Sequence, residues 1–340
     1  MLYGFWYANL GAFNGDVLCD LAAQYLALAE KQRATIPLMV GHRLVGSSSL
    51  HTGDFVDSRA HYDQAFSLYD ADEHRSLTTR FGQDILVSIL SFRSITLWML
   101  GYPEAALTDA DQVVKGAREI GHAASLIYAL AVTSVPHLLV GNYASVNAQT
   151  DEAVAMAEEI GEVFWKEMGA TVQGYVLALT GKASEAVHQI TSGIAACRSM
   201  GATVWLPKEL SYLAKAYAEL GQFDDAWRCS EEAITHIETT KERWWEAEVN
   251  RIAGEIALLS PEPDIDKAET YFERALAVAR QQQAKSWELR ASMSLARLWR
   301  DQGNRVEARE LLAPVYGWFT EGFDARDLKE AEGLLEELAA

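Results

Sequence analysis

Residues 177–187 read LALTGKASEAV, and the Gly181-Lys182 pair comes closer to a catalytic motif than any other part of the sequence. In a phosphate-binding loop, backbone N–H groups and a lysine surround a nucleotide's phosphates, and the pattern G-x-x-x-x-G-K-[ST] lies between a strand and a helix. Here the preceding glycine is Gly174, seven residues before Gly181, and Ala183 replaces the Ser or Thr that would hold magnesium. The segment before Gly181 also has helical spacing. We therefore predict a turn and no nucleotide site.

Other motifs for catalysis or metal binding are absent from the sequence. The eight histidines never fall at the i, i+4 spacing of a helical metal site, and no H-E-x-x-H, C-x-x-C or G-x-S-x-G occurs. Cys19, Cys197 and Cys229 are too few and too widely separated for a disulfide framework, which favours the reducing cytoplasm. We predict a cytoplasmic protein that is not an enzyme and has no cofactor and no metal.

The overall charge excludes two classes of partner. The chain has 340 residues and a net charge of −19, so its surface as a whole repels nucleic acid and anionic lipid. We expect no signal peptide and no apolar stretch of about 18 residues that would span a bilayer. A protein, a peptide or a small effector remains as the expected partner.

A glycine-type bend recurs along the chain, mostly at steps of 40 residues. A small residue precedes each bend by seven positions, and a second small residue, usually alanine, follows twelve positions after it. The first set is Ala8, Gly46, Ser94, Ser134, Gly174, Ala214, Gly254 and Ala296. Small residues at these places let two antiparallel helices approach closely across a tight turn, and the segments between bends have 3.6-residue apolar spacing. The pattern predicts stacked helical hairpins.

This spacing resembles the tetratricopeptide repeat (TPR), in which a small residue, a glycine seven later and alanines five and twelve after that recur. The resemblance implies an all-α fold, a right-handed superhelical solenoid of about eight TPR-like hairpins with a period of about 40 residues. It departs from the common 34-residue repeat in length, and it lacks the proline that usually closes a repeat. As one solenoid domain, 1–340, its expected repeats are 1–33, 34–80, 83–121, 122–161, 162–201, 202–242, 243–284 and 285–320, with a capping helix over 326–338.

Two stretches carry a narrower resemblance. Residues 68–103, ending LWMLGYP, and residues 240–255, which begin TKERWWEAE, look like the C-terminal repeat region of bacterial signalling proteins. Those proteins join a nucleotidyl cyclase or DNA-binding domain to an AAA-type or STAND ATPase, and their repeats serve as sensor and scaffold. The resemblance implies a non-catalytic interaction module whose catalytic domains lie upstream or on a partner.

In repeats of this kind, the first helix of each hairpin lines the concave groove, and this geometry selects the expected ligand-binding residues. They are Arg43, Trp98, Tyr128, Tyr175, Lys208, Lys215, Arg251, Arg290 and Arg297. The middle of the groove would be apolar and aromatic and its C-terminal half basic, which suits a peptide with apolar anchors and an acidic part. The alternative is that these aromatic and charged side chains only fill and pair within a tightly wound superhelix.

Two other segments are candidate functional sites besides the groove. The first hairpin would leave Leu2, Phe5, Trp6, Leu10 and Phe13 partly bare, so the chain is expected to be a separated tail of a larger protein or to dock through residues 1–13. A structural array that forms a homo-oligomer through this face is the alternative function. The long connector 70–84 contains His74, but pairing of Arg75 and Arg80 with Asp70 and Asp84 is the favoured explanation for its charges.

Overall fold

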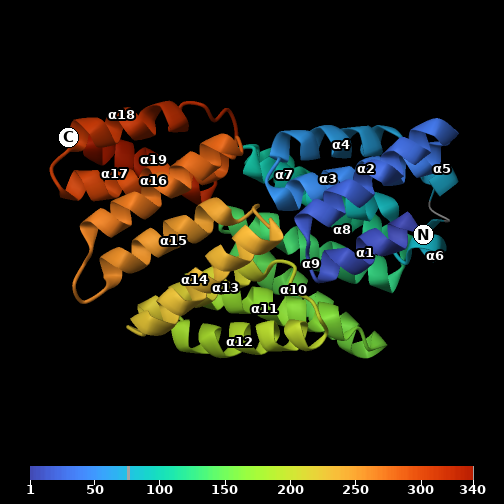
Figure 1. Ribbon diagram of the computed structural model, residues 1–340, viewed down its shortest axis with the longest axis horizontal. Coiled ribbons are helices and arrows are strands. Elements are labelled where there is room, and N and C mark those ends of the chain that lie inside the picture. The colour runs from blue at the N-terminus through green and yellow to red at the C-terminus, as the bar shows by residue number, and fades with distance from the viewer. Residues whose placement is uncertain (75–76, 340) are drawn as a thin grey trace.

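The computed structural model describes residues 1–74 and 77–339, and every regular element within them is a helix (Figure 1). The helices are α1 Leu2–Gly11, α2 Gly15–Gln32, α3 Thr35–Thr52, α4 Phe55–Ser67, α5 Ala71–His74, α6 Thr78–Phe81, α7 Ile85–Met99, α8 Pro103–Ile120, α9 Ala123–Val140, α10 Tyr143–Ile160, α11 Val163–Leu179, α12 Ala183–Ser199, α13 Leu206–Glu219, α14 Phe223–Thr240, α15 Glu246–Leu259, α16 Ile265–Gln281, α17 Lys285–Asp301, α18 Arg305–Tyr316 and α19 Arg326–Ala339. The predicted all-α superhelical array is confirmed.

The helices form two layers. The first helices of successive hairpins, α3, α7, α9, α11, α13, α15 and α17, each contact the next one and line the inside of the superhelix. Their partners, α4, α8, α10, α12, α14, α16 and α18, form the outer layer, and α19 continues the inner layer beyond α17. Side chains on the inner face of consecutive first helices are thereby brought together.

The turns explain the glycine pattern. Gly181 has φ of 77° and joins α11 to α12 with Lys182 exposed, so the Gly-Lys pair is a hairpin turn as predicted. Within the hairpins, a Cβ on Gly254 would lie 2.5 Å from the Phe272 ring, which shows how closely α15 and α16 pack. Gly15 differs from the expectation, because it is the first residue of α2 and the bend precedes it.

The superhelix closes on itself after five hairpins. The Gly11 carbonyl at the end of α1 accepts the backbone N–H groups of Thr203 (2.8 Å) and Val204 (3.0 Å), just before α13. In the same way the His51 carbonyl at the end of α3 accepts the N–H groups of Arg243 (2.8 Å) and Trp244, just before α15. The last carbonyls of a helix and the first N–H groups of another lack partners within their own helices, so each pair of ends satisfies the other.

The same offset brings the C-terminal hairpin beside α7 and α8 (Figure 1). The carboxylate of Glu321 accepts the N–H groups of Glu104 and Ala105 at the start of α8, each at 3.0 Å. In return, the Glu104 carboxylate accepts the N–H of Gly322 at 2.8 Å. We call this reciprocal pair of contacts, together with the end-to-end contacts of α1 and α3, the seam.

Closure turns the middle of the groove into a core. Trp98 of α7 packs edge-on against Trp287 of α17, with ring centroids 4.7 Å apart, and Trp287 packs in the same way against Trp245. All three side chains are buried. Among the described helices, α9 is apolar and long enough to cross a bilayer, so the expectation of no such stretch was wrong; most of α9 is buried in this core.

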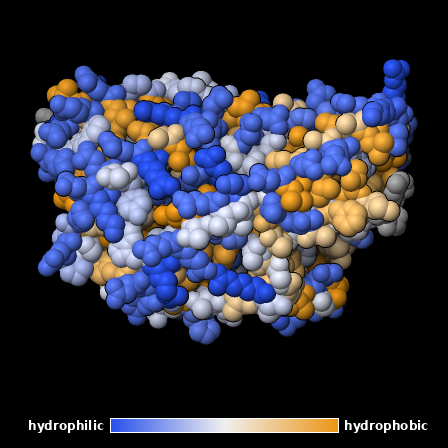
Figure 2. All heavy atoms as spheres, in the orientation of Figure 1, coloured by the Kyte–Doolittle hydropathy of each residue, from blue (hydrophilic) through white to orange (hydrophobic). Residues whose placement is uncertain are grey.

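The first hairpin is better covered than its sequence predicts. Trp6 and Phe13 are buried, and the Trp6 indole N–H donates to the Ser48 hydroxyl at 3.0 Å, so the expectation that both are partly bare was wrong. Phe5 is 54% exposed, and Figure 2 shows apolar side chains gathered over α1. Val17 and Leu28 of α2 are exposed as well, so the exposed strip along α1 is one part of the apolar surface of this hairpin.

Candidate functional site: a charged pocket inside the superhelix

The structure gathers four of the nine predicted groove residues in one pocket. Lys215, Arg251, Arg290 and Arg297 project from α13, α15 and α17 into a space bounded on its other sides by α9, α11 and α19. The empty volume is about 730 Å³, part of which is open to solvent. We call this space the charged pocket.

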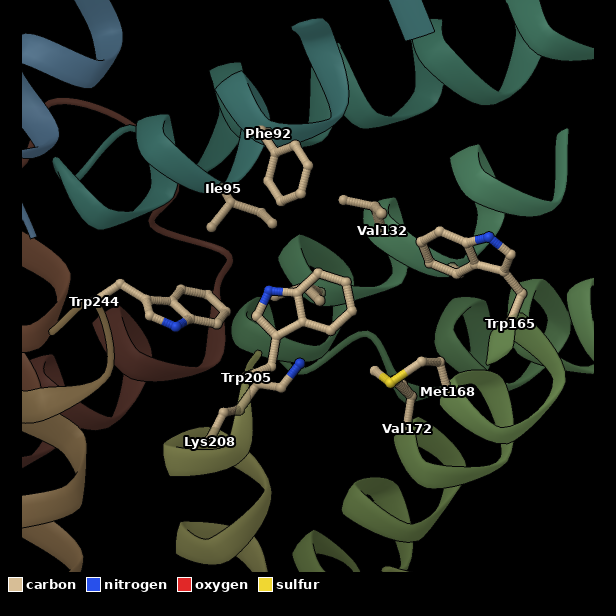
Figure 3. A pocket seen from close by; sticks show the side chains of 11 residues that line it. Phe92, Ile95, Val132, Trp165, Met168, Val172, Trp205, Lys208 and Trp244 are labelled. Atoms are coloured by element: carbon tan, nitrogen blue, oxygen red, sulfur yellow. The ribbon is translucent and has the colours of Figure 1, made fainter. Parts of the chain in front are cut away.

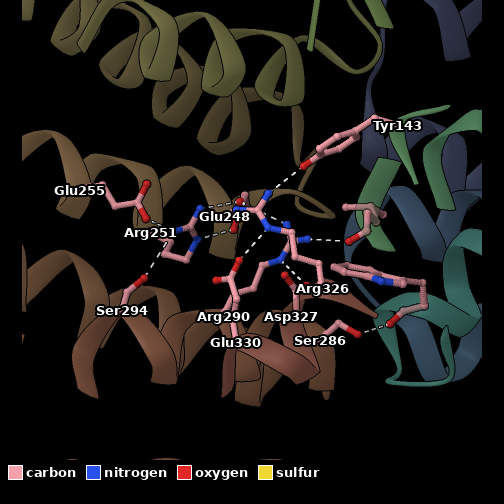
Figure 4. A network of polar contacts seen from close by, with 12 residues as sticks. Tyr143, Glu248, Arg251, Glu255, Ser286, Arg290, Ser294, Arg326, Asp327 and Glu330 are labelled. Carbon is pink, nitrogen blue, oxygen red and sulfur yellow. Dashed lines mark hydrogen bonds and ion pairs between the residues drawn. The ribbon is translucent and has the colours of Figure 1, made fainter. Parts of the chain in front are cut away.

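Arg251 is the most enclosed cation of the charged pocket. Its Nε and Nη2 donate to the two carboxylate oxygens of Glu248 at 2.7 and 2.8 Å, and its Nη1 donates to Glu255 and to the Ser294 hydroxyl (Figure 4). Burial alone would raise the pKa of Glu248, but the guanidinium groups of Arg251 and Arg290 outweigh it and hold that pKa below its usual value.

Arg290 connects the pocket to the end of α9 and to α19. Its Nε donates to Asp327 at the start of α19 at 2.7 Å, and its Nη2 donates to the Leu139 carbonyl at the end of α9 at 2.8 Å (Figure 4). The guanidinium carbon also lies 5.1 Å from the ring centroids of Trp98 and of Trp287. Arg290 is therefore a structural tie between two turns of the superhelix as well as part of the pocket wall.

The outer rim of the pocket is made with α19. Glu330 accepts from Arg297 at 3.0 Å and from Arg326 at 2.7 Å, and Arg326 also donates to the Tyr143 hydroxyl at 2.7 Å. Burial would raise the pKa of Glu330, and its two arginine partners hold it below the usual value instead. Arg297 and Arg326 are both partly exposed, so these two cations of the rim are the ones that a ligand reaches most easily.

The groove geometry placed Glu248 and Glu255 beside these cations, but sequence reasoning missed the other acids at the charged pocket. Asp327 and Glu330 come from α19, which was expected only to cap the array, and Glu219 pairs with Lys215 at 3.3 Å. These acids therefore offset the excess of positive charge that was expected from the first helices. A usable signal was present, because α19 takes the place of a further first helix and its acids follow the arginines of α17 by about 35 residues.

The other five predicted residues lie outside the charged pocket. Arg43 is buried beneath the first hairpin, where its Nη1 donates to the Ser88 hydroxyl at 2.7 Å and its guanidinium lies over the rings of Tyr3 and Tyr7. Trp98, Tyr128, Tyr175 and Lys208 are also buried. These side chains are buried inside the wound superhelix, and their role in binding a ligand stays a prediction.

The connector 70–84 is only partly described. The Nδ1 atom of His74 accepts the backbone N–H of Asp70 at 2.9 Å, and the ring is buried. Arg75 and the side chain of Arg80 lie outside the described residues, so their expected pairing stays a prediction.

Comparison with known proteins gives structural relatives only. No family model and no curated protein matches the chain. A Rap protein complexed with Competence and Sporulation Factor has a TM-score of 0.63 and 12% identity over 94% of this chain and 81% of its own. The Rap conjugation gene regulator of plasmid pLS20, in complex with the Phr* peptide, has a TM-score of 0.61 and 13% identity over 92% and 77%. Aspartyl phosphate phosphatase F from Bacillus subtilis has a TM-score of 0.52 and 13% identity over 87% and 74%. At these identities the likeness shows the fold, a TPR-type helical array.

Proposed function

We propose that this chain is a non-catalytic interaction module that binds a peptide, or an extended segment of a partner protein, at the charged pocket. The observation that carries the proposal is the balance of charge within that pocket, where every lining arginine already has a carboxylate partner. A purely anionic ligand would displace those carboxylates and leave them buried and unpaired, which is strongly unfavourable. A peptide offers groups of both signs together with amides, so it can exchange partners with arginines and carboxylates alike.

Two further points support a peptide. The pocket is reached from the inner face of the array, the surface that repeat proteins use for binding. Two of the structures that share this fold are described as complexes with a peptide or a sporulation factor. The resemblance of residues 68–103 and 240–255 to the repeats of ATPase and cyclase signalling proteins suggests that binding is passed on to such an output domain.

We infer that the chain itself has no catalytic role. One protein of the same fold is a phosphatase by name, so the fold alone does not decide this point. Within the described residues, however, no three potential metal ligands cluster, and the Gly181-Lys182 turn is an exposed hairpin connection. We also propose a cytoplasmic location, because the three widely separated cysteines suit a reducing compartment.

The test uses two cations that can be removed without exposing a lone buried charge. In Arg297→Gln, Glu330 keeps Arg326 as a partner, and in Lys215→Gln the partner Glu219 is itself partly exposed. A randomised hexapeptide library is selected on the wild-type chain, and the affinities of the selected peptides are measured by fluorescence polarisation. We expect at least about tenfold weaker binding to each variant.

The matched control is Arg228→Gln, which removes an equally ion-paired arginine from the outer surface of α14. Its affinities are expected to equal those of the wild-type chain. Peptides that bind Arg297→Gln and Lys215→Gln as tightly as they bind the wild type would place recognition elsewhere and refute the proposal, as would a library from which nothing is selected.

The second candidate is a structural array that self-associates through the exposed strip of α1. Phe5 is the observation that favours it, because a large apolar side chain that is more than half exposed is suited to an interface. Sedimentation of the wild-type chain and of Phe5→Ser tests it: oligomers that vanish in the variant support this role. Trp6 is unsuitable for the test, since its removal would disturb the core.

A further inference from the structure

The contacts between superhelical turns follow one rule, by which the end of a first helix meets the start of the first helix five hairpins later. The backbone hydrogen bonds of the seam join α1 to α13 and α3 to α15 in this way. The end of α7 meets the start of α17, where the Ser286 hydroxyl donates to the Trp98 carbonyl. The end of α9 meets the start of α19, where a Cβ on Gly141 would lie 3.1 Å from the Cβ of Arg326. The rule assigns the start of α11 to a first helix one place before α1, and none of the described helices takes that place.

Tryptophans at the starts of three first helices show the difference. Trp165, Trp205 and Trp245 recur at steps of 40 residues, at the starts of α11, α13 and α15. Trp205 and Trp245 are buried, and their indole N–H groups donate to side chains of other inner helices. Trp165 is partly exposed, its indole N–H has no hydrogen-bond partner among the described residues, and Figure 3 shows it at the end of the row that it forms with Trp205 and Trp244. The tryptophan without a helix end beside it is therefore the one that stays exposed.

The start of α11 also exposes aliphatic side chains. Val163, the first residue of α11, is 57% exposed, and Ile160, the last residue of α10, is 48% exposed. Just before α13 and α15, the residues that meet a helix end include Val204 and Trp244, and both are buried. The side chain of Glu162, the N-cap of α11, accepts no N–H of that helix. The start of α11 therefore leaves uncovered the kind of groups that its counterparts place against a helix end.

The exposed strip of α1 bounds the same space. The end of α1 binds the residues just before Trp205, and the Trp205 ring centroid lies 6.5 Å from that of Trp165. On the strip, Phe5 stands beside exposed Gly4 and Ala8, and no other part of the described chain comes within 4 Å of a Cβ built on Gly4. Small residues at this place would let another helix approach α1 closely. We call the space between the strip of α1 and the start of α11 the open position.

The two ends of the array differ in polarity. The exposed side chains of α19, the last inner helix, are mostly charged, among them Lys329, Glu332 and Glu336, as is usual for an array end that faces water. The exposed strip of α1 is apolar instead and includes Phe5, which is 54% exposed. The C-terminal end of a second copy therefore offers no apolar face to the open position, and a helix of another protein is the occupant that fits.

We propose that the open position binds an amphipathic helix of a partner protein, which lies beside α1 and runs in the same direction, as a further first helix would. Its apolar side packs on Phe5, and its carboxyl end packs on Val163 and Trp165. The proposal does not rest on peptide binding at the charged pocket, because none of these three residues lines that pocket.

Hydrogen bonding and charge favour this direction of the partner helix. The last carbonyls of a helix lack partners within it, so they can accept from the Trp165 indole and from the first N–H groups of α11. The ends of α1 and α3 accept from the connectors before α13 and α15 in the same way. Glu159 and Glu162 are exposed beside the start of α11, so lysine or arginine in the last turn of the partner helix suits both these acids and the dipole of that helix.

The experiment uses the full chain and a displayed library of amphipathic peptides of 18 residues, the length of α3. Positions spaced three and four residues apart are randomised among apolar residues, and lysines occupy the last turn. Fluorescence polarisation measures the affinities of the peptides selected on the wild-type chain. Phe5→Ser and Val163→Ser are each expected to weaken binding at least about fivefold, because each removes an apolar side chain that binding buries. Both side chains are more than half exposed in the free chain, so both variants are expected to keep its melting temperature.

Two control variants should bind the selected peptides as the wild type does. Leu259→Ser removes an equally exposed apolar side chain at the end of α15, and Arg297→Gln alters the charged pocket, so it separates this proposal from peptide binding there. Peptides remade with their lysines in the first turn should bind more weakly.

Three outcomes overturn the proposal. The first is a set of peptides that bind Phe5→Ser or Val163→Ser as tightly as the wild type, because both sides of the open position must contribute. The second is a library from which nothing is selected. The third is a wild-type dimer that both variants abolish, because a second copy then occupies the open position.

Discussion

At the scale of single residues, the structure is distinguished by a charge that is buried between neighbours of the opposite sign. Glu248 lies between two arginines, Arg251 and Arg290, and is almost fully enclosed. Because those guanidinium groups hold the Glu248 pKa below its unfolded value, its ionised form stabilises the fold above about pH 4.5, and that contribution disappears as the pH falls through the folded pKa. One carboxylate thus balances two cations of the charged pocket.

Replacing Glu248 with Gln should lower the free energy of unfolding at pH 7 by about 3 kcal/mol, because two buried guanidinium groups lose their shared partner. Urea unfolding at pH 7 and at pH 3 measures the effect. It should shrink in acid, because below about pH 4.5 the Glu248 carboxyl of the unfolded chain is protonated and must lose its proton on folding. Glu262→Gln, in the exposed turn after α15, is the control and should change little. An equal loss at both pH values would contradict the ionic explanation.

The sequence predicts only some of the residues of the charged pocket, and their positions in the repeats explain which ones. Lys215, Arg251, Arg290 and Arg297 stand at related positions of consecutive first helices, so the repeat spacing alone predicts that they share a face. The same spacing predicts Glu248 and Glu255, the partners of Arg251, but it does not predict the partners of Arg290 and Arg297. Asp327 and Glu330 belong to a helix outside the repeat pattern, and the Leu139 carbonyl reaches Arg290 only because the superhelix closes.

At the scale of elements, the seam depends on a neutral histidine. The His51 ring at the end of α3 donates from Nδ1 to the Ser47 carbonyl at 2.8 Å, which leaves Nε2 as the acceptor for the Trp205 indole. Burial lowers the His51 pKa; Glu242 opposes this and Lys208 adds to it. The apolar side chains that pack on the ring, from α7 and from the connectors before α2 and α15, carry no charge.

Acid should therefore weaken the seam. The folded pKa lies below the unfolded value of about 6.5, so the stability that neutral His51 contributes is complete above that value and declines as the pH falls below it. His51→Phe should remove this part of the pH dependence and should lower stability at pH 8 by about 1–3 kcal/mol, since the Trp205 indole loses its acceptor. Thermal melts from pH 8 to pH 5 measure both effects.

His61, half-buried on α4, offers the control, because its ring contacts His42 and Asp57 away from the seam. His61→Phe should keep the acid-dependent loss of the wild-type chain. If His51→Phe showed the same fall in melting temperature between pH 8 and pH 5 as the wild type, another group would be responsible.

At the scale of the whole molecule, closure makes the array compact. A compact chain of this length has a radius of gyration of about 20 Å. We expect small-angle scattering to give a value near this for the wild type. Glu104→Ala combined with Glu321→Ala, which removes the reciprocal contacts between α8 and the C-terminal hairpin, should increase the radius and speed amide exchange in α19. A wild-type radius well above the compact value, or no change in the variant, would contradict a closed seam.

The sequence predicts the array but not its closure, and the reason is physical. The 40-residue spacing of small residues and bends reports contacts within a hairpin and between neighbouring hairpins, which are local in the chain. The seam joins groups more than 190 residues apart, as in the contact of the Gly11 carbonyl with Thr203. Many of its hydrogen bonds use backbone atoms, which leave no mark on residue type. The curvature that brings these groups together is the sum of small rotations between hairpins.

The five-hairpin offset of the seam also restricts how this protein can change in length. An open array can gain or lose one repeat with a nearly constant change in stability, because each repeat meets only its neighbours. Here a hairpin inserted between α3 and α15 would carry the His51 carbonyl past Arg243 and Trp244, and would misalign the other end-to-end contacts at once. Such proteins usually lengthen by duplicating single repeats. In this chain a repeat can be added without misaligning the seam only outside the helices that the seam joins.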